Sequence, residues 1–198
     1  RDRLKVREGS LQFWVNLKDY VDTGLFLEHR ELRHLLYAEA ANKTFLNLFC
    51  YTATASVFAI KGGAQSSTSV DLSRTYLDWA EDNFILNGIK PSSKHQLIQA
   101  DCLQWLERQG NYDLIFCNPP VFSNSKRMQQ TWDIQRDHVS LILRAMRLLS
   151  PSGKLIFSTH AERFKLDPRL FQEYSIEDLS KLLLPLDFKK QRFSCFRL

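Results

Sequence analysis

The sequence predicts an α/β fold in which a mostly parallel β-sheet is covered by helices on both faces. Short apolar strands alternate with helix-like segments between residues 44 and 159, and this alternation is typical of parallel sheets. Several of the predicted strands end in an acidic or amide residue, at the edge where open α/β sheets bind ligands. One of them, Tyr112–Cys117, runs directly into Asn118-Pro119-Pro120.

Runs of apolar residues bounded by turn-forming residues predict the strands. Leu11–Val15 alternates apolar and polar residues ahead of the main fold, which is a strand pattern. We expect Arg192–Leu198 to close the sheet, whereas Ile176–Leu184 fits a helix or a strand equally well. The other predicted strands are Thr44–Phe49, Gln65–Asp71, Lys94–Ala100, Tyr112–Cys117 and Lys154–Thr159.

Helical spacing of apolar residues, together with start and stop signals, predicts the helices. Ser73 is a suitable N-cap and Gly88 a suitable stop for the helix between them. Gly62-Gly63 ends an earlier helix, and Pro151 and Gly153 end a later one. The predicted helices are Glu28–Ala41, Ala53–Lys61, Arg74–Asn87, Cys102–Arg108 and Thr131–Leu149.

The composition suits one domain with a single core, since 44% of the 198 residues are hydrophobic. The cysteines have no C-x-x-C spacing, so we expect free thiols in a reducing cytoplasm and no metal site. They are Cys50, Cys102, Cys117 and Cys195. No apolar run reaches the ~20 residues of a membrane span, and no signal peptide is evident. Because the chain begins with Arg1, we expect either a processed chain or a piece of a longer one.

Polar residues recur at the predicted strand ends. Asn47 lies within one strand, Asp71 and Asp101 end the next two, and Asn118 follows the fourth. A single strand-end acid is usually a helix N-cap, but a series on neighbouring strands favours a shared ligand. A nucleoside fits this series. Asp71 would accept both ribose hydroxyls, and Asp101 would accept from the adenine amino group beside the Cys102 N–H.

The loop after the first of these strands distinguishes between cofactors. It reads Phe49-Cys50-Tyr51-Thr52-Ala53-Thr54, without the glycines of the G-x-G-x-x-G fingerprint that a dinucleotide needs. S-adenosylmethionine has no pyrophosphate, so the loop favours a methyltransferase over a nicotinamide oxidoreductase. The N–H groups of this loop and the following helix N-terminus would hold the polar tail of the cofactor.

Five segments resemble the bacterial large-subunit rRNA methyltransferases. The resemblance extends from about Leu11 to Leu198 and is strongest with the half of the bifunctional 23S rRNA guanine methyltransferases that acts on guanine N7. It implies a class I, Rossmann-like fold with a seven-stranded sheet and a strand near Ile176–Leu179. It also implies a second methyltransferase half and an RNA-binding region outside this chain. The segments are residues 22–30 (DTGLFLEHR), 46–52 (LNLFCYT), 70–76 (VDLSRTY), 99–103 (QADCL) and 118–128 (NPPVFSNSKRM).

The resemblance also assigns parts of the chain. Residues 1–26 correspond to a β-rich lead-in and residues 27–198 to the methyltransferase domain. The family usually has Gly where Ala53 stands, so we expect the extra methyl group to crowd the cofactor tail. It often has Asp where Asn118 stands, so we do not expect Asn118 to take up a proton. The predicted cofactor-binding residues are Arg30, Asn47, Phe49, Tyr51, Thr52, Asp71, Leu72, Asp101, Cys102 and Asn118.

The predicted substrate is guanine in 23S rRNA. Guanine N7 has a lone pair and no proton, so its methylation needs positioning instead of a general base. Asn118 is the expected catalytic hydrogen-bonding residue and Phe122 the expected stacking face. Core packing is an equal alternative for Phe122. For Arg30, a position on a helix surface is the alternative to binding the cofactor carboxylate. Basic residues would contact RNA phosphates: Lys126, Arg127, Lys189, Lys190, Arg192 and Arg197.

Three alternatives remain: a nicotinamide oxidoreductase, opposed by the missing glycine fingerprint, and the two that follow. Methylation of an exocyclic amine, such as guanine N2, also suits Asn-Pro-Pro followed by an aromatic residue. A non-catalytic RNA-binding module would have a degenerate cofactor pocket. A covalent cytosine methyltransferase is disfavoured, because Pro119-Pro120 and Ser158-Thr159-His160 stand where relatives of this fold place the nucleophilic thiol.

Overall fold

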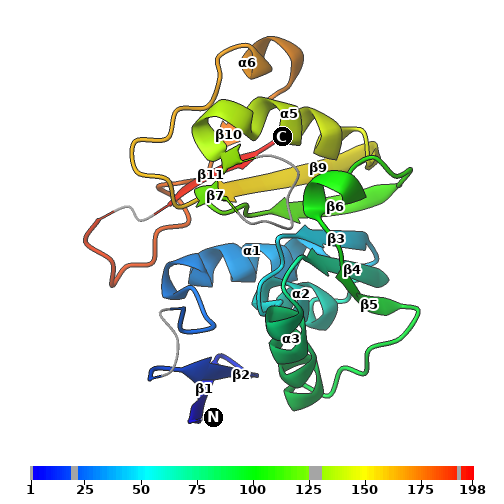
Figure 1. Ribbon diagram of the computed structural model, residues 1–198, viewed down its shortest axis with the longest axis vertical. Helices are drawn as coiled ribbons and strands as arrows, with labels where there is room; N and C mark the ends of the chain where they lie inside the picture. The colour runs from blue at the N-terminus through cyan, green and yellow to red at the C-terminus, as the bar shows by residue number, and fades with distance from the viewer. Residues whose placement is uncertain (1, 19–21, 125–130, 191–192) are drawn as a thin grey trace.

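A seven-stranded, mostly parallel sheet forms the centre of the computed structural model, which describes residues 2–18, 22–124, 131–190 and 193–198. The strand order is β10-β11-β9-β6-β3-β4-β5 (Figure 1). The parallel strands are β3 (Thr44–Leu48), β4 (Ser66–Asp71), β5 (His95–Gln99), β6 (Tyr112–Cys117) and β9 (Leu149–Thr159). β11 (Ser194–Arg197) is antiparallel to β9, and β10 (Glu177–Asp178) is antiparallel to β11. The predicted fold class is confirmed.

Side chains of alternate residues along β3 pack into different halves of the core. Leu46 and Leu48 are fully buried in the cluster that contains residues of α5 (Ile134–Met146) and α4 (Cys102–Trp105). Phe45 is buried in the cluster formed with α1 (Arg30–Glu39) and α2 (Thr54–Lys61). Because side chains alternate across a strand, these two clusters identify the helices that cover each face of the sheet.

A hairpin of β1 (Arg3–Glu8) and β2 (Leu11–Asn16) precedes the sheet and lies beside α3 (Arg74–Leu86) at the bottom of Figure 1. The strand predicted at Leu11–Val15 is therefore confirmed, and the sequence analysis missed its partner, β1. Phe13 and Val15 pack with α2 and α3 in a third apolar cluster. Backbone N–H groups of β2 also donate to the side-chain oxygens of Asn83 on α3 and of Asn87, its C-cap, at 2.9 and 3.0 Å.

The buried ion pair between Glu8 and Arg33 joins this hairpin to α1. Arg33 is 1% exposed, and its Nε donates to Glu8 Oε1 at 2.8 Å. A further guanidinium nitrogen donates to the carbonyl of Phe26 at 2.7 Å. A guanidinium buried in this way needs its partners, because an isolated charge in the core is strongly unfavourable.

The helix predicted over Thr131–Leu149 is shorter at both ends. Residues Trp132–Asp133 form β8, which pairs with β7 (Phe122–Ser123), and α5 begins at Ile134. Asp133 caps it by accepting from Arg136 N at 3.0 Å. At the other end β9 already begins at Leu149, so Pro151 and Gly153 lie inside a strand, beside a register shift against β6.

The remaining elements are short. They are the 3-10 helix η1 (Leu27–His29) and α6 (Leu170–Glu173), and α4 covers four residues of the predicted Cys102–Arg108. The segment whose pattern fitted either helix or strand contains β10, as the resemblance implied. Ser73 caps α3 as predicted, with Oγ accepting from Tyr76 N at 3.4 Å. In the part of the chain that the structure describes, no helix is long and apolar enough to cross a bilayer.

Candidate functional site

A cavity of about 390 Å³ opens at the carboxyl ends of the parallel strands. Residues at or just after the ends of β3, β4, β5, β6 and β9 all contribute to its lining. The volume lies within the 300–1,000 Å³ range of small-molecule sites. The sequence-predicted residues among those that line it are Phe49, Tyr51, Asp71, Leu72, Asp101, Cys102 and Asn118.

The loop after β3 turns sharply through left-handed backbone conformations. Phe49, Tyr51 and Ala53 have φ values of 55°, 52° and 53°, a region that non-glycine residues seldom adopt. Ala53 is fully buried in the third apolar cluster and is not among the residues that line the cavity. Its left-handed conformation explains why glycine suits this position, and its methyl group packs in the core instead of crowding the cavity.

Four backbone N–H groups of this loop already have partners within the protein. Those of Cys50 and Ala53 donate to the carbonyls of Val70 and Cys50, at 3.0 and 2.8 Å. The N–H of Tyr51 donates to Asp71 Oδ2 at 2.9 Å, and that of Phe49 points to Cys102 Sγ at 3.2 Å. These four groups stabilise the strained loop, so the geometry does not support the expectation that they bind a polar tail.

Asp71 joins two loops at the edge of the cavity. Its Oδ2 accepts from Tyr51 N at 2.9 Å and its Oδ1 from Ser73 N at 2.8 Å. Burial raises the pKa of this carboxyl above its usual value, although these two N–H groups oppose the shift. A carboxylate has about four lone-pair sites. Asp71 therefore keeps acceptor capacity for a ligand while it holds both loops.

Asp101 combines capping with a place in the cavity lining. Its Oδ1 accepts from Leu103 N at 2.8 Å at the start of α4. The N-cap interpretation and the ligand interpretation of Asp71 and Asp101 are therefore compatible, since each carboxylate bonds a helix-start N–H and also reaches the cavity.

Asn118 presents an unpaired acceptor in the site. It lines the cavity directly after β6, and its buried Oδ1 has no hydrogen-bond partner among the described residues. The following turn is fixed, because Trp132 Nε1 donates to the carbonyl of Pro120 at 2.7 Å. An unpaired buried acceptor is costly, and this one lies where a ligand would supply the donor.

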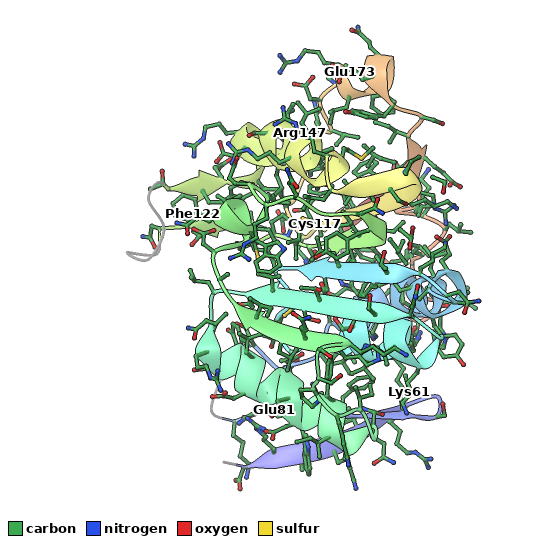
Figure 2. All side chains as sticks on the ribbon, turned by 90° about the vertical axis from the view of Figure 1, so that its right-hand side faces the viewer. Lys61, Glu81, Cys117, Phe122, Arg147 and Glu173 are labelled. Atoms are coloured by element: carbon green, nitrogen blue, oxygen red, sulfur yellow. The ribbon has the colours of Figure 1, made fainter. Side chains whose placement is uncertain are left out.

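Four predicted site residues do not line the cavity. Arg30 forms an ion pair with Asp187 on the surface, and neither Asn47 nor Thr52 contributes to the lining. Asn47 is buried and donates through Nδ2 to Ser56 Oγ at 2.8 Å, while Thr52 Oγ1 donates to Gly24 O at 2.7 Å. Phe122 on β7 is 58% exposed and projects from the edge of the molecule in Figure 2, which excludes the core-packing alternative.

The sequence analysis missed an aromatic wall on the cavity. Phe26, Tyr76 and His160 line it together with Asp22, whose Oδ2 accepts from Tyr76 Oη at 2.8 Å. The ring centroids of Phe26 and His160 are 4.7 Å apart. The family resemblance could have indicated three of these residues. Asp22 and Phe26 fall in residues 22–30 and Tyr76 in residues 70–76, two segments that carry the resemblance.

Gly24 connects residues 22–30 to the loop after β3. Its N–H donates to Tyr51 Oη at 2.6 Å, and its carbonyl accepts from Thr52 Oγ1. It has a φ of +92°, and a Cβ at this position would collide with the Trp79 indole. Only glycine satisfies both restrictions.

The basic residues predicted to bind RNA differ in their surroundings. Lys126, Arg127 and Arg192 lie outside the described residues, and Lys189 and Lys190 are exposed. Arg197 bonds Glu39 and Glu177 at 2.6 and 2.8 Å, so its charge is already neutralised within the protein.

Comparisons with known proteins identify the family. A family model described as S-adenosylmethionine-dependent methyltransferase matches residues 2–184. The chain belongs to this family. The methyltransferase SMU.776, solved in complex with SAH, superposes with a TM-score of 0.84 and 28% identity over 98% of this chain and 55% of that one. An S-adenosylmethionine-dependent methyltransferase from Streptococcus mutans gives 0.82 and 27%, covering 100% of this chain and 55% of that one. The fold is the Rossmann-like class I methyltransferase fold, and the cofactor of the family is S-adenosylmethionine.

Curated relatives share more of the sequence. The protein named Ribosomal RNA large subunit methyltransferase K/L from Ectopseudomonas mendocina is 55% identical over 188 residues, which are 94% of this chain and 26% of the relative. The protein of the same name from Chromohalobacter salexigens is 52% identical over 191 residues, 96% and 26% respectively. The chain thus spans about a quarter of the length of these relatives.

Proposed function

We propose that this chain is the part of a longer large-subunit rRNA methyltransferase that transfers a methyl group from S-adenosylmethionine to N7 of a guanine. The names of the relatives support the rRNA substrate. The resemblance of residues 118–128 to the N7-specific half supports the base and the atom. The observation that carries the proposal is the cavity, where Asp71, Asp101 and Asn118 from three strand ends line one space.

The residues present fit the cofactor. Asp71 has acceptor capacity for two ribose hydroxyls, and Asp101 would accept from the adenine amino group. The buried, unpaired Oδ1 of Asn118 would accept from an N–H donor, either the methionine ammonium group or the substrate base. When bound, S-adenosylmethionine supplies an electrophilic methyl group.

The chain's residues suit a nucleophile that carries no proton. Asn118 orients its partner but takes up no proton, and guanine N7 has none to lose. Cys117, which precedes Asn118, and Cys102, which lines the cavity, are poor nucleophiles. Cys117 is 1% exposed and lies near the middle of the molecule in Figure 2. Cys102 bonds the carbonyl of Val70 at 3.4 Å, and burial raises the pKa of its thiol well above the usual value. Both observations disfavour a covalent cytosine mechanism.

RNA would approach beside the β7–β8 hairpin. Phe122 offers an exposed ring, while its neighbours Val121 and Ser123 line the cavity. Stacking of an unpaired base on such a ring contributes about 1–3 kcal/mol. Lys126 and Arg127, close in sequence, would contact phosphates.

A second candidate is methylation of guanine N2. The same unpaired Oδ1 of Asn118 favours it, because a carbonyl acceptor suits an exocyclic amine. In that reaction a proton leaves the amine, so a proton acceptor is needed in addition to positioning.

Mass-spectrometric mapping of nucleosides decides between the candidates. Protein-free 23S rRNA is incubated with the 198-residue chain and S-adenosylmethionine, then digested, with Asn118→Ala as the inactive control. We expect N7-methylguanosine from the wild type and a large loss of product with the variant. N2-methylguanosine would select the second candidate. Intact RNA binding without cofactor binding in calorimetry would identify a non-catalytic module.

A further inference from the structure

His160 lies at the end of the cavity opposite the two carboxylates. It follows β9 directly and lines the cavity with Asn118, which follows the adjacent strand β6. Asp71 ends β4 and Asp101 follows β5, two strands on the far side of β3 in the sheet order. A ligand whose adenosine is bound by these two acids would therefore leave the His160 end to the substrate.

A carboxylate holds the imidazole of His160. Its Nε2 lies 3.0 Å from Glu28 Oε1, and the two side chains are 24% and 19% exposed. Burial opposes ionisation of Glu28, but its interaction with the His160 side chain, a backbone N–H and the charge of Arg33 lower the pKa of this carboxyl below its usual value. Glu28 is thus an anion at neutral pH, and its negative charge beside Nε2 favours the hydrogen on that nitrogen.

Neighbouring rings fix the plane of the imidazole. The centroids of Phe26 and His29 lie 4.7 and 4.6 Å from that of His160, at interplanar angles of 30° and 27°. His29 is 3% exposed, and burial lowers its pKa well below the usual value. A neutral His29 and an apolar Phe26 add no charge of their own, so Glu28 determines which ring nitrogen of His160 carries the hydrogen.

The second ring nitrogen is left for a ligand. When one nitrogen of a neutral imidazole carries the hydrogen, the other nitrogen is a hydrogen-bond acceptor. In the described part of the chain, Nδ1 of His160 has no hydrogen-bond partner that would occupy it. No Lys or Arg stands among the described residues that line the cavity, so this acceptor faces no competing cation.

We propose that Nδ1 of His160, oriented by Glu28, accepts a hydrogen bond from N1–H of the target purine and so selects guanine over adenine. Guanine carries a hydrogen on N1, whereas N1 of adenine is an acceptor and would oppose Nδ1. The inference rests on the proposed function only in that a purine enters this cavity, and it applies whether N7 or N2 is methylated. His160 is the specificity-determining residue, and Glu28 is a positioning residue.

Binding of mononucleotides tests this selection without any methyl transfer. GMP, IMP and AMP are titrated against the 198-residue chain in the presence of S-adenosylhomocysteine, followed by NMR chemical shifts. IMP keeps N1–H and lacks the 2-amino group, so it isolates the proposed contact. The variants are His160→Phe, which keeps a stacking ring, and Glu28→Gln. His34→Phe is the matched control, because His34 is exposed on α1 and contacts the Phe58 ring.

We expect the wild type and His34→Phe to bind GMP and IMP at least ~10-fold more tightly than AMP, since a site built to bond an N–H rejects a base that lacks it. His160→Phe should bring the three affinities within about twofold, and Glu28→Gln should give an intermediate loss. A purely structural role would lower all three affinities together. Equal wild-type affinities, no binding of GMP and IMP, or full preference in His160→Phe would overturn the inference. Failure of the proposed function would appear separately, as absent cofactor binding or absent product in the rRNA assay.

Discussion

Replacing Asp71 with asparagine separates the two roles of this carboxylate. Its oxygens accept from Tyr51 N and Ser73 N at 2.9 and 2.8 Å. Asparagine keeps one acceptor and turns an amide N–H₂ toward the other donor, so one charge-assisted bond is lost. Such a bond contributes about 1.5–3 kcal/mol. We therefore expect Asp71→Asn to lower the free energy of unfolding by about 2 kcal/mol while the chain still folds.

The expected effect on the cofactor is a separate quantity. If Asp71 accepts from ribose hydroxyls, loss of its charge weakens those bonds by a further ~1.5–3 kcal/mol, which raises the Kd for S-adenosylmethionine about 10- to 150-fold. Urea unfolding without ligand measures the first effect. Isothermal titration with S-adenosylmethionine, under conditions where the variant is folded, measures the second.

Asp113 supplies the matched control at the opposite edge of the sheet. It is the second residue of β6, where its Oδ2 accepts from Thr44 N at 2.9 Å and its Oδ1 from Ser150 Oγ at 2.8 Å. Asp113→Asn should destabilise the fold to a similar degree and leave cofactor affinity within about twofold of the wild type. A wild-type Kd in Asp71→Asn, or the same loss of affinity in both variants, would refute the assignment of Asp71 to the ribose.

Further variants test the lead-in hairpin, the Glu28 carboxyl and the strained loop. Glu8→Ala leaves Arg33 buried without its carboxylate and should cost about 3–5 kcal/mol in urea unfolding; a change below 1 kcal/mol would contradict this. The pKa of Glu28 is lowered in the folded state, so its stabilisation is present above its unfolded pKa and lost as the pH falls through the folded one. The wild type should therefore lose more stability than Glu28→Gln as the pH falls below about 4.5, measured by thermal unfolding at a series of pH values. Ala53→Gly removes left-handed strain but also a buried methyl group and some chain stiffness, so stability should change by less than ~1 kcal/mol with unchanged cofactor affinity in titration; tighter binding would show that the methyl group crowds the cavity.

Buried parallel strands were the most predictable part of the fold. β3 and β6 are apolar runs bounded by turn residues, and their ends differ from the predicted ones by at most a residue. Strands covered on both faces read as continuous apolar runs, so local sequence is sufficient for them. The acids at the ends of such strands were predictable for the same reason, because register carries them to one edge.

Elements defined by tertiary contacts were less predictable. β1 is mostly charged or exposed and becomes a strand by pairing with β2. The start of β9 contains Pro151 and Gly153, which signal a turn, yet the strand passes through them where its register against β6 shifts. Proline is compatible with a strand at such an irregularity, but nothing local in the sequence marks one.

The segment from Asp22 to Glu28 explains why part of the site escaped sequence reasoning. It contains no strand, so no register argument places it, yet Asp22 and Phe26 line the cavity and Glu28 holds His160. Its position depends on Gly24 bonding Tyr51 and on the anchoring of the preceding hairpin to α1. The boundary drawn at residue 26 stays a prediction, but the contacts that cross it belong to the cavity wall. A variant that loosens the hairpin, such as Glu8→Ala, should therefore weaken cofactor binding although Glu8 is not among the residues that line the cavity.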